Sequence, residues 1–208
     1  MATAESTGVA QPVTKRGQAT KRALLDAAEE VFGDNSYERA SIAEITRRAG
    51  VAQGTFYLYF PDKNSVFVEL VRKLNHGLRQ HIASRLEGVE SRIAAEREGL
   101  LAFFEYATEH RALYKVVREA EFVDEEIYQW HYQTLTDGYV RGLRRAMESG
   151  EIADDISPET MAVAIMGINQ LLGSIWIIVG RTQPPEEVID EIMTFIARGI
   201  GARSEVGE

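Results

Sequence analysis

The sequence predicts an all-α protein in which an N-terminal three-helix head, containing a helix-turn-helix, is joined to a larger helical part. Apolar residues recur at helical spacing throughout the 208 residues, and no segment of useful length alternates as a strand would. Ser41, Asp62 and Ser157 stand where helix N-caps are expected, each just before an apolar periodic segment. About nine helices are therefore expected.

The same pattern divides the chain into a tail, a head and a second domain. Residues 1–14 are small and polar without periodicity, which predicts a disordered tail. Residues 15–77 are expected to form the head, with the helix-turn-helix at 40–59, and residues 78–208 the second domain. Helices in the second domain are expected at 91–110, 111–119, 123–148, 158–180 and 185–200.

Charge is distributed unevenly along the chain, whose net charge is −9. Residues 1–85 carry 12 Lys and Arg against 9 Asp and Glu, whereas residues 86–208 carry 11 against 23. This asymmetry indicates that only the first part meets a polyanion. Cysteine is absent, which excludes disulfides and thiolate metal sites, and the N-terminus lacks an apolar signal core. A cytoplasmic protein is expected.

Residues 41–59 predict two short helices joined by a turn. Ser41 begins the first with capping-box spacing to Glu44, and Gly50 lies in the turn before a second helix at 52–59. Neither helix is long enough to be stable alone, so both must pack on neighbouring helices. A helix-turn-helix has this arrangement, and its second helix can lie in the major groove of DNA.

A helical wheel separates the two faces of the second short helix. Phe56 and Phe60 fall together and are expected to face the core. Gly54, Thr55 and Leu58 fall on the opposite side. This side suits a groove, because glycine permits close backbone approach and the other two can touch a thymine methyl.

The flanks of that helix add polar groups suited to DNA. The hydroxyls of Tyr57 and Tyr59 can reach phosphates, and the amide of Gln53 can reach a base edge. Lys63, at the start of the next helix, can pair with a phosphate. From residue types and spacing alone, two short helices of an ordinary helical bundle remain an alternative.

A longer motif resembles the signature of the TetR family of transcriptional regulators. It reads Ser41-x3-Ile45-x3-Ala49-Gly50-Val51-x2-Gly54-Thr55-Phe56-Tyr57-x-Tyr59-Phe60-x2-Lys63, and the preceding helix, with Ala27-Ala28 and Val31-Phe32-Gly33, matches as well. The resemblance covers roughly residues 20–65. It implies a homodimer that binds a pseudo-palindromic double-stranded DNA operator and represses transcription. Position 59 is a histidine in many members, so Tyr59 departs from the pattern.

The resemblance gives a set of residues predicted to contact DNA. Positions matching Gln53, Thr55, Tyr57, Tyr59 and Lys63 commonly touch DNA in the family, and the position matching Gly54 lies close to it. The full predicted set is Ser41, Gln53, Gly54, Thr55, Tyr57, Leu58, Tyr59 and Lys63. Leu58 occupies a variable position and is expected to tune the sequence that is recognised.

Residues 161–180 are apolar nearly all round and admit two interpretations. They are long enough to span a bilayer, but Asn169 and Gln170 at the centre would be costly in lipid and the flanks lack a basic cluster. The favoured interpretation is a helix covered by its own domain and by a second copy of the chain, with no membrane partner. The residues predicted for the dimer interface are Ile165, Ile168, Leu172, Ile175, Val188, Ile192, Phe195 and Ile196.

Aromatic residues concentrate between the head and these last helices. They form either ordinary core or the wall of a cavity for a small effector, since tyrosines bring polar tips into an apolar lining. The predicted cavity residues are Phe103, Phe104, Tyr106, Tyr114, Arg118, Phe122, Tyr128, Trp130, His131, Tyr132, Leu135, Asn169, Gln170 and Trp176. In the family, effector binding moves the heads and releases the operator.

The effector class follows only from a looser resemblance. The run from Tyr114 to Phe122, with Met166-Gly167-x4-Leu172-Gly173-x2-Trp176, resembles regulators of fatty-acid and aromatic-acid catabolism, some of which respond to acyl-CoA. A lipophilic drug, as in efflux regulators, is the alternative effector. A constitutive DNA-binding protein without an inducer is the alternative function.

An enzyme is not expected. The sequence has no phosphate loop, dinucleotide fingerprint, nucleophile elbow or His-Glu-x-x-His motif, and no Glu-x-x-His pair for a di-metal site. No catalytic residues, metal site or cofactor are therefore predicted.

Overall fold

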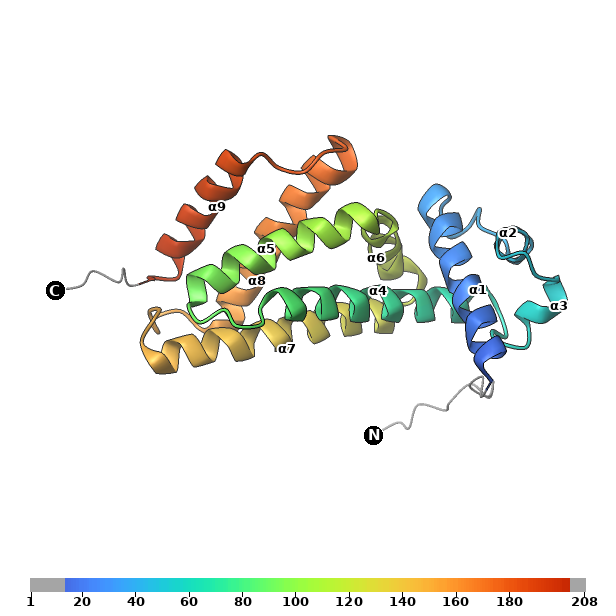
Figure 1. The fold of residues 1–208 in the computed structure, drawn as a ribbon, viewed down its shortest axis with the longest axis horizontal. Helices are drawn as coiled ribbons and strands as arrows, with labels where there is room; N and C mark the ends of the chain where they lie inside the picture. Colours follow the sequence, from blue (N-terminus) through green and yellow to red (C-terminus); the bar gives the residue numbers. More distant parts are fainter. Residues whose placement is uncertain (1–13, 203–208) are drawn as a thin grey trace. The chain divides into compact units, whose positions relative to one another are not determined.

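The computed structural model describes residues 14–202, and this part of the chain is helical without a strand (Figure 1). The predicted all-α class is thus confirmed. The predicted tail lies outside the described residues except for Thr14, which is the N-cap of the first helix and accepts a hydrogen bond from the Gly17 N–H at 3.1 Å.

Four helices make up the start of the described fold. They are α1 (Lys15–Asp34), α2 (Ile42–Arg48), α3 (Gln53–Phe56) and α4 (Lys63–Arg85). Then follow α5 (Arg92–Glu109), α6 (Ala112–Val123), α7 (Glu125–Ser149), α8 (Pro158–Gly173), the π-helical segment η1 (Ser174–Val179) and α9 (Glu186–Gly199). The chain divides into two compact units.

The first unit comprises the described residues up to Lys73 together with Lys115–Tyr128. Its core joins apolar side chains of α1, α2, α3 and α4, among them Phe32, Ile45, Phe56 and Phe67, all without exposed surface. Phe32 and Phe67 pack edge to face with ring centres 5.2 Å apart. These contacts hold the two short helices, which could not persist alone.

Most of α6 belongs to the first unit through polar contacts with the head. The Lys115 ammonium donates to the Gly33 carbonyl at 3.1 Å, and the Tyr37 N–H donates to the Glu119 carboxylate at 2.8 Å. The compact unit therefore contains a segment that lies far from the head in sequence.

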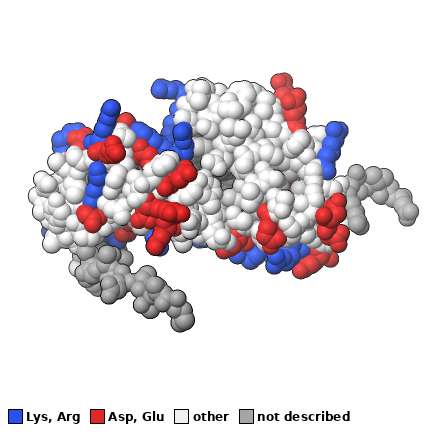
Figure 2. Space-filling model, turned by 180° about the vertical axis from the view of Figure 1, so that it is seen from behind, with Lys and Arg blue, Asp and Glu red and all other residues white. Residues whose placement is uncertain are grey.

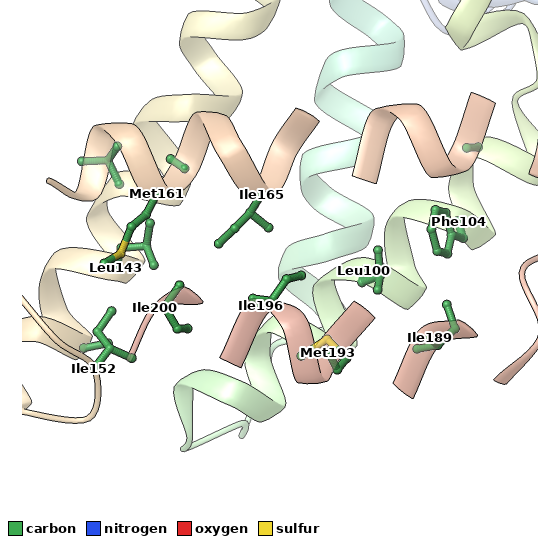
Figure 3. Close-up of a cluster of buried hydrophobic side chains, with 14 of the residues drawn as sticks. Leu100, Phe104, Leu143, Ile152, Met161, Ile165, Ile189, Met193, Ile196 and Ile200 are labelled. Carbon is green, nitrogen blue, oxygen red and sulfur yellow. The ribbon is translucent and has the colours of Figure 1, made fainter. Parts of the chain in front are cut away.

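The second unit comprises Leu74–Tyr114 and the described residues from Gln129 onward. Its core is an apolar cluster in which side chains of α5, α7, α8 and α9 meet, as Figure 3 shows. Each of the four helices contributes buried side chains to it, for example Leu100 from α5, Leu143 from α7, Ile165 from α8 and Ile196 from α9. Packing of α5 against α8, η1 and α9 follows from this shared cluster.

Three predicted helix boundaries differ from the structure. The helix predicted at 52–59 is α-helical only over Gln53–Phe56 and continues as turns, and the helix predicted at 111–119 extends to Val123. The helix predicted at 158–180 changes to a π-helix after Gly173. Apolar periodicity cannot separate these forms here, because segments of four to six residues are too short to define a period.

The segment Pro158–Val179 is long and apolar enough to cross a bilayer by length and composition, with a mean hydropathy of 1.9. Only 22% of its most apolar stretch is buried within the chain. Core helices of soluble proteins pass the same test, so this property alone does not place the segment in a membrane.

Candidate nucleic-acid interface and effector-binding interior

The turn of the helix-turn-helix is built around one glycine. Gly50 has a φ of +66°, a conformation that side chains rarely adopt, and its N–H donates to the Arg47 carbonyl at 3.3 Å. At the other end of α2, the Ser41 hydroxyl accepts from the Glu44 N–H at 3.2 Å, which confirms the predicted N-cap. Local residue chemistry thus fixes both ends of this helix.

The second short helix shows the two faces that the wheel predicts. Phe56 and Phe60 are buried with ring centres 5.5 Å apart, whereas Tyr57 is 49% exposed and Leu58 is 69% exposed. The Tyr59 N–H donates to the Phe56 carbonyl at 2.9 Å, so these residues lie in ordered turns after α3. An exposed aromatic and an exposed aliphatic side chain therefore lie beside each other on a rigid support.

Gly54 has no internal reason to be glycine. It lies in α3 without a positive φ, and a methyl group added there would meet no atom of the chain within 4 Å. Gln53 beside it is exposed as well. Packing within the chain therefore does not require glycine at this position, whereas close approach of another molecule would.

Lys63 is engaged within the head. Its ammonium donates to the carbonyls of Tyr37, Ala40 and Glu38 at 2.8, 3.1 and 3.5 Å, and it lies 4.4 Å from the centre of the Tyr37 ring. Three bonds use all three ammonium hydrogens. Lys63 therefore holds the segment that leads into α2, and its contact with a phosphate remains a prediction.

Arginines on α2 are paired with an acid. Arg47 and then Arg48 donate hydrogen bonds to the Glu44 carboxylate, which lower its pKa to about 2. Arg48 also donates to Asp34 at 2.7 Å, whereas the Arg47 side chain is 70% exposed. Arg47 is thus the more accessible of these two cations.

The structure brings together some of the predicted cavity residues. In the second unit Phe103 packs edge to face on Tyr114 with ring centres 6.1 Å apart, and the Gln170 amide donates to the Tyr132 hydroxyl at 2.9 Å. Burial, and then the nearby Tyr132, raise the pKa of Tyr114 well above its usual value. Four helices, α5 to α8, thus contribute to one polar and aromatic group.

Other predicted cavity residues are placed differently. Phe104 lies in the apolar core, and Tyr106 is buried against Gly77, where a methyl group would overlap the tyrosine hydroxyl. Trp130, Leu135, Asn169 and Trp176 are partly buried in the second unit, and Tyr128 is partly buried in the first. Arg118 is exposed and Phe122 is 86% exposed, so neither belongs to the buried group.

A buried polar pair includes one residue that the sequence did not single out. Asn75 has no exposed surface, and its amide nitrogen lies 3.1 Å from the His131 carbonyl and 3.2 Å from His131 Nδ1. Burial lowers the pKa of His131 to about 4. Asn75 could have been noticed, because it stands four residues after Val71 and three before Leu78, which are both buried on α4.

A buried ion pair was also missed. Glu96 is 3% exposed, accepts from Arg92 Nε at 2.8 Å and accepts a hydrogen bond from the Tyr139 hydroxyl. Burial, and then the negative charge of Glu96, raise the pKa of Tyr139. This group joins α5 to α7. Among the described residues, no three acidic or histidine side chains are grouped as a metal site would require.

The predicted interface residues separate into two groups. Ile165 and Ile196 point into the core of their own unit, with Ile168, Leu172 and Ile192 packed against it (Figure 3). Ile175 and Phe195 are exposed, and Val188 is partly buried. Further exposed apolar residues of the same helices are Val163, Leu171, Ile178 and Val179. In Figure 2, a broad surface in the upper part of the view carries few charged side chains.

Residues 24–70 match the model of the bacterial regulatory proteins of the tetR family, which places the helix-turn-helix inside a known domain. The chain carries a TetR-family N-terminal domain. The resemblance inferred from the motif is thereby confirmed.

Two relatives of similar length have the names of regulators. The uncharacterized HTH-type transcriptional regulator YvdT of Bacillus subtilis (strain 168) is 26% identical over 181 residues, 86% of this chain and 93% of the relative. The fatty acid metabolism regulator protein of the same organism is 23% identical over 187 residues, 85% and 93% of the two chains.

A solved structure shows the same fold. The transcriptional regulator FadR from Bacillus subtilis, solved in complex with stearoyl-CoA, superposes with a TM-score of 0.76 at 19% identity. The match covers 86% of this chain and 98% of that one. The two chains therefore share one fold over most of their length.

Proposed function

We propose that this TetR-type protein is a homodimeric repressor that binds a pseudo-palindromic operator and is released by a small apolar effector. The observation that carries the proposal is the surface after α3, where Tyr57 and Leu58 are exposed on buried Phe56 and Phe60. A TetR-family match over residues 24–70 supports the same role. The functional division we propose is a DNA-binding head at 15–77 and an effector and dimer domain at 78–208.

The proposed DNA contacts follow from the exposed face of the head. Gln53 offers an amide to a base edge, Gly54 allows the backbone close to the groove, and Leu58 offers apolar contact to a thymine methyl. Ser41, Thr55, Tyr57, Tyr59 and Lys63 complete the proposed set, chiefly through phosphates. Such a protein acts in the cytoplasm, where the DNA is, and its relatives are regulators, not enzymes.

The proposed dimer uses the exposed apolar face of α8, η1 and α9. Leu171 is 62% exposed, Val179 78% and Phe195 67%, which is unusual for aliphatic and aromatic side chains in one region of a lone chain. A second copy presenting the same face would bury them, and a two-fold axis would offer two heads to two half-sites.

The proposed effector is an acyl-CoA-type compound. Two observations support this class: the 23% identity to a fatty acid metabolism regulator and the fold shared with FadR in its stearoyl-CoA complex. The helix α4 has residues in both units, so an effector-dependent shift of α4 would reach the head. Effector and operator would then oppose each other by ~1–3 kcal/mol of coupling.

The test is selection of bound fragments from a random DNA pool with the full-length protein, at a stated salt concentration and without effector. We expect enrichment of a pseudo-palindrome. A folded soluble protein that enriches no sequence would overturn the proposal, and recovery in the membrane fraction would favour a tethered adaptor instead. A lipophilic-drug response would retain the repressor and replace its effector class, and operator binding indifferent to every effector would indicate a constitutive protein.

Leu58 provides a sharper version of the same test. We expect Leu58→Ala to change the bases preferred at one position of each half-site, because an exposed side chain that contacts a base can be removed without disturbing the core. The measurement is the same selection carried out in parallel with both proteins. An unchanged preference would exclude Leu58 from base recognition.

A further inference from the structure

The buried hydroxyl of Tyr114 has no hydrogen-bond partner. Tyr114 lies in the first turn of α6, within the second unit, and is 8% exposed. Its hydroxyl oxygen is fully enclosed by the chain and bonds to nothing. Buried polar groups are nearly always satisfied, because an unmade hydrogen bond in the interior costs free energy. A ligand group that accepted a hydrogen bond from this hydroxyl would remove that cost.

The surroundings of this hydroxyl are built to hold it in place. It lies against the backbone of Gly173, where a methyl group would overlap it, so only glycine at 173 leaves it room. The π-helical segment η1 begins immediately after Gly173, and π-turns inside helices occur frequently at functional sites. At position 173, therefore, the Tyr114 hydroxyl meets a glycine just where the helix becomes irregular.

Neighbouring side chains border space that solvent can reach. Phe103 packs on the Tyr114 ring, and the Tyr132 hydroxyl is close enough to affect the pKa of Tyr114. Gln170 in turn donates to Tyr132 at 2.9 Å. Phe103, Tyr132 and Gln170 are only partly buried. An entering molecule could thus meet an apolar ring first and then a hydrogen-bond donor.

The interior of the second unit is uncharged around these groups. Among its described residues, Glu96 is the one charged side chain that is buried, and it is already bonded to Arg92 and Tyr139. His131 is neutral near pH 7, because burial lowers its pKa to about 4. A carboxylate placed in this interior would find no uncommitted cation, because the largely buried Arg92 is already paired with Glu96, and an unpaired buried charge is strongly disfavoured.

We propose that the Tyr114 hydroxyl anchors the effector by donating a hydrogen bond to an uncharged carbonyl oxygen, so that acyl thioesters or esters bind and free carboxylates are rejected. This inference rests on the proposed effector-responsive function and specifies its ligand. A neutral carbonyl needs one donor and no counter-ion, and Tyr114 supplies that donor. An acyl chain extending from the carbonyl would lie against the aromatic side chains.

The test compares two ligands of equal chain length by calorimetry on the full-length protein at pH 7.5. They are the uncharged N-acetylcysteamine thioester of decanoic acid and decanoate itself. We expect the thioester to bind at least about tenfold more tightly, since an uncompensated charge costs at least that ratio. Equal or tighter binding of decanoate, or no binding of the thioester, would overturn the proposal.

Two variants separate anchoring from folding. Tyr114→Phe keeps the ring and removes the donor, so the thioester affinity should fall about fivefold, as expected for one neutral hydrogen bond. Without ligand, the variant should unfold at the same temperature as the parent protein or at a higher one, because it loses a buried hydroxyl that has no partner. Tyr37→Phe, the same change in the first unit, should leave the thioester affinity unaltered. An unchanged affinity in Tyr114→Phe would overturn the assignment. Operator selection is performed without any effector, so its failure is distinguishable from failure here.

Discussion

At Gly54 the surrounding structure leaves space for a side chain. A methyl group there meets nothing within 4 Å, so Gly54→Ala should change the free energy of unfolding by less than about 1 kcal/mol. The same methyl group would hold the backbone away from the groove, and operator affinity should fall by about tenfold or more. Thermal unfolding and a fluorescence binding titration measure the two quantities.

The matched control is Gly99→Ala in α5, where an added methyl group also has nothing within 4 Å. This variant should retain both stability and operator affinity. If the two alanine variants bind the operator equally well, Gly54 does not lie close to DNA.

Because His131 is buried, we expect the protein to lose stability at acidic pH. Burial lowers the pKa of His131 to about 4 in the folded chain, against 6.5 for an exposed histidine, so the unfolded chain takes up a proton first as the pH falls. The free energy of unfolding should therefore drop between about pH 6.5 and pH 4 and be independent of this group above that range. The total loss is about 3 kcal/mol, at 1.36 kcal/mol per pKa unit.

The geometry of Asn75 explains why the neutral ring is favoured. The amide nitrogen faces the His131 carbonyl, which can only accept, so the same nitrogen must donate to Nδ1. A proton on Nδ1 would place two donors together. Urea unfolding across this pH range measures the effect, and in His131→Gln the slope assigned to the histidine should disappear. If the variant keeps the parent's slope of unfolding free energy against pH, that slope comes from groups other than His131.

At the scale of single elements, α5 and α7 are joined by the buried Glu96. Removing its carboxylate in Glu96→Ala would leave Arg92 and the Tyr139 hydroxyl without their partner, and a broken buried pair costs about 3–5 kcal/mol. Urea unfolding at neutral pH measures the loss.

The control for this prediction is the exposed pair of Arg144 and Glu159, whose side chains are 57% and 56% exposed. Arg144→Ala should cost less than about 1 kcal/mol, since solvent screens such pairs. Similar losses in the two variants would mean that burial of Glu96 does not determine its contribution.

The elements that the sequence predicted are those set by local chemistry. Ser41 caps α2 and Ser157 caps α8 because a hydroxyl three residues before a backbone N–H needs no distant partner. Phe56 and Phe60 were placed in the core by spacing alone. The end of α3 at Phe56 and the change to η1 after Gly173 were not predicted, because they leave the spacing of apolar residues almost unchanged.

Residues of the candidate sites were harder to predict wherever their role depends on a distant partner. Lys63 was expected to face DNA, but its bonds to the carbonyls of Tyr37 and Ala40 become visible only when α4 meets the loop before α2. Tyr114 was predicted as one aromatic residue among many. Its distinction, a buried hydroxyl without a partner, depends on Gly173 nearly sixty residues away.

At the scale of the whole molecule, the proposed release of the operator needs a helix that has residues in both units, and α4 is one such helix. Its residues to Lys73 belong to the first unit and those from Leu74 to the second, where Asn75 and Leu78 are buried. In the proposed mechanism, a displacement of α4 in the second unit would be passed along the helix to its residues in the first unit. The resulting effect on the operator is limited to the difference in effector affinity between the two states.

The proposed dimer should dissociate when a charged side chain is placed in its apolar face. Leu171 is 62% exposed on α8, and Leu171→Glu would bury an unpaired carboxylate in the interface. Light scattering after gel filtration should then give the monomer mass at micromolar concentration. One head makes half of the phosphate contacts, so the slope of log affinity against log salt concentration should also fall about twofold.

Phe122→Glu is the matched control, since Phe122 is 86% exposed but lies in the first unit, outside α8, η1 and α9. The same change from an apolar to an acidic side chain should leave the dimer mass unchanged. A dimer in both variants would mean that subunits associate through another surface, and a monomer in both would indicate a general effect of added charge. Only the loss of the dimer in Leu171→Glu alone assigns the interface to α8, η1 and α9, because both variants change the net charge equally.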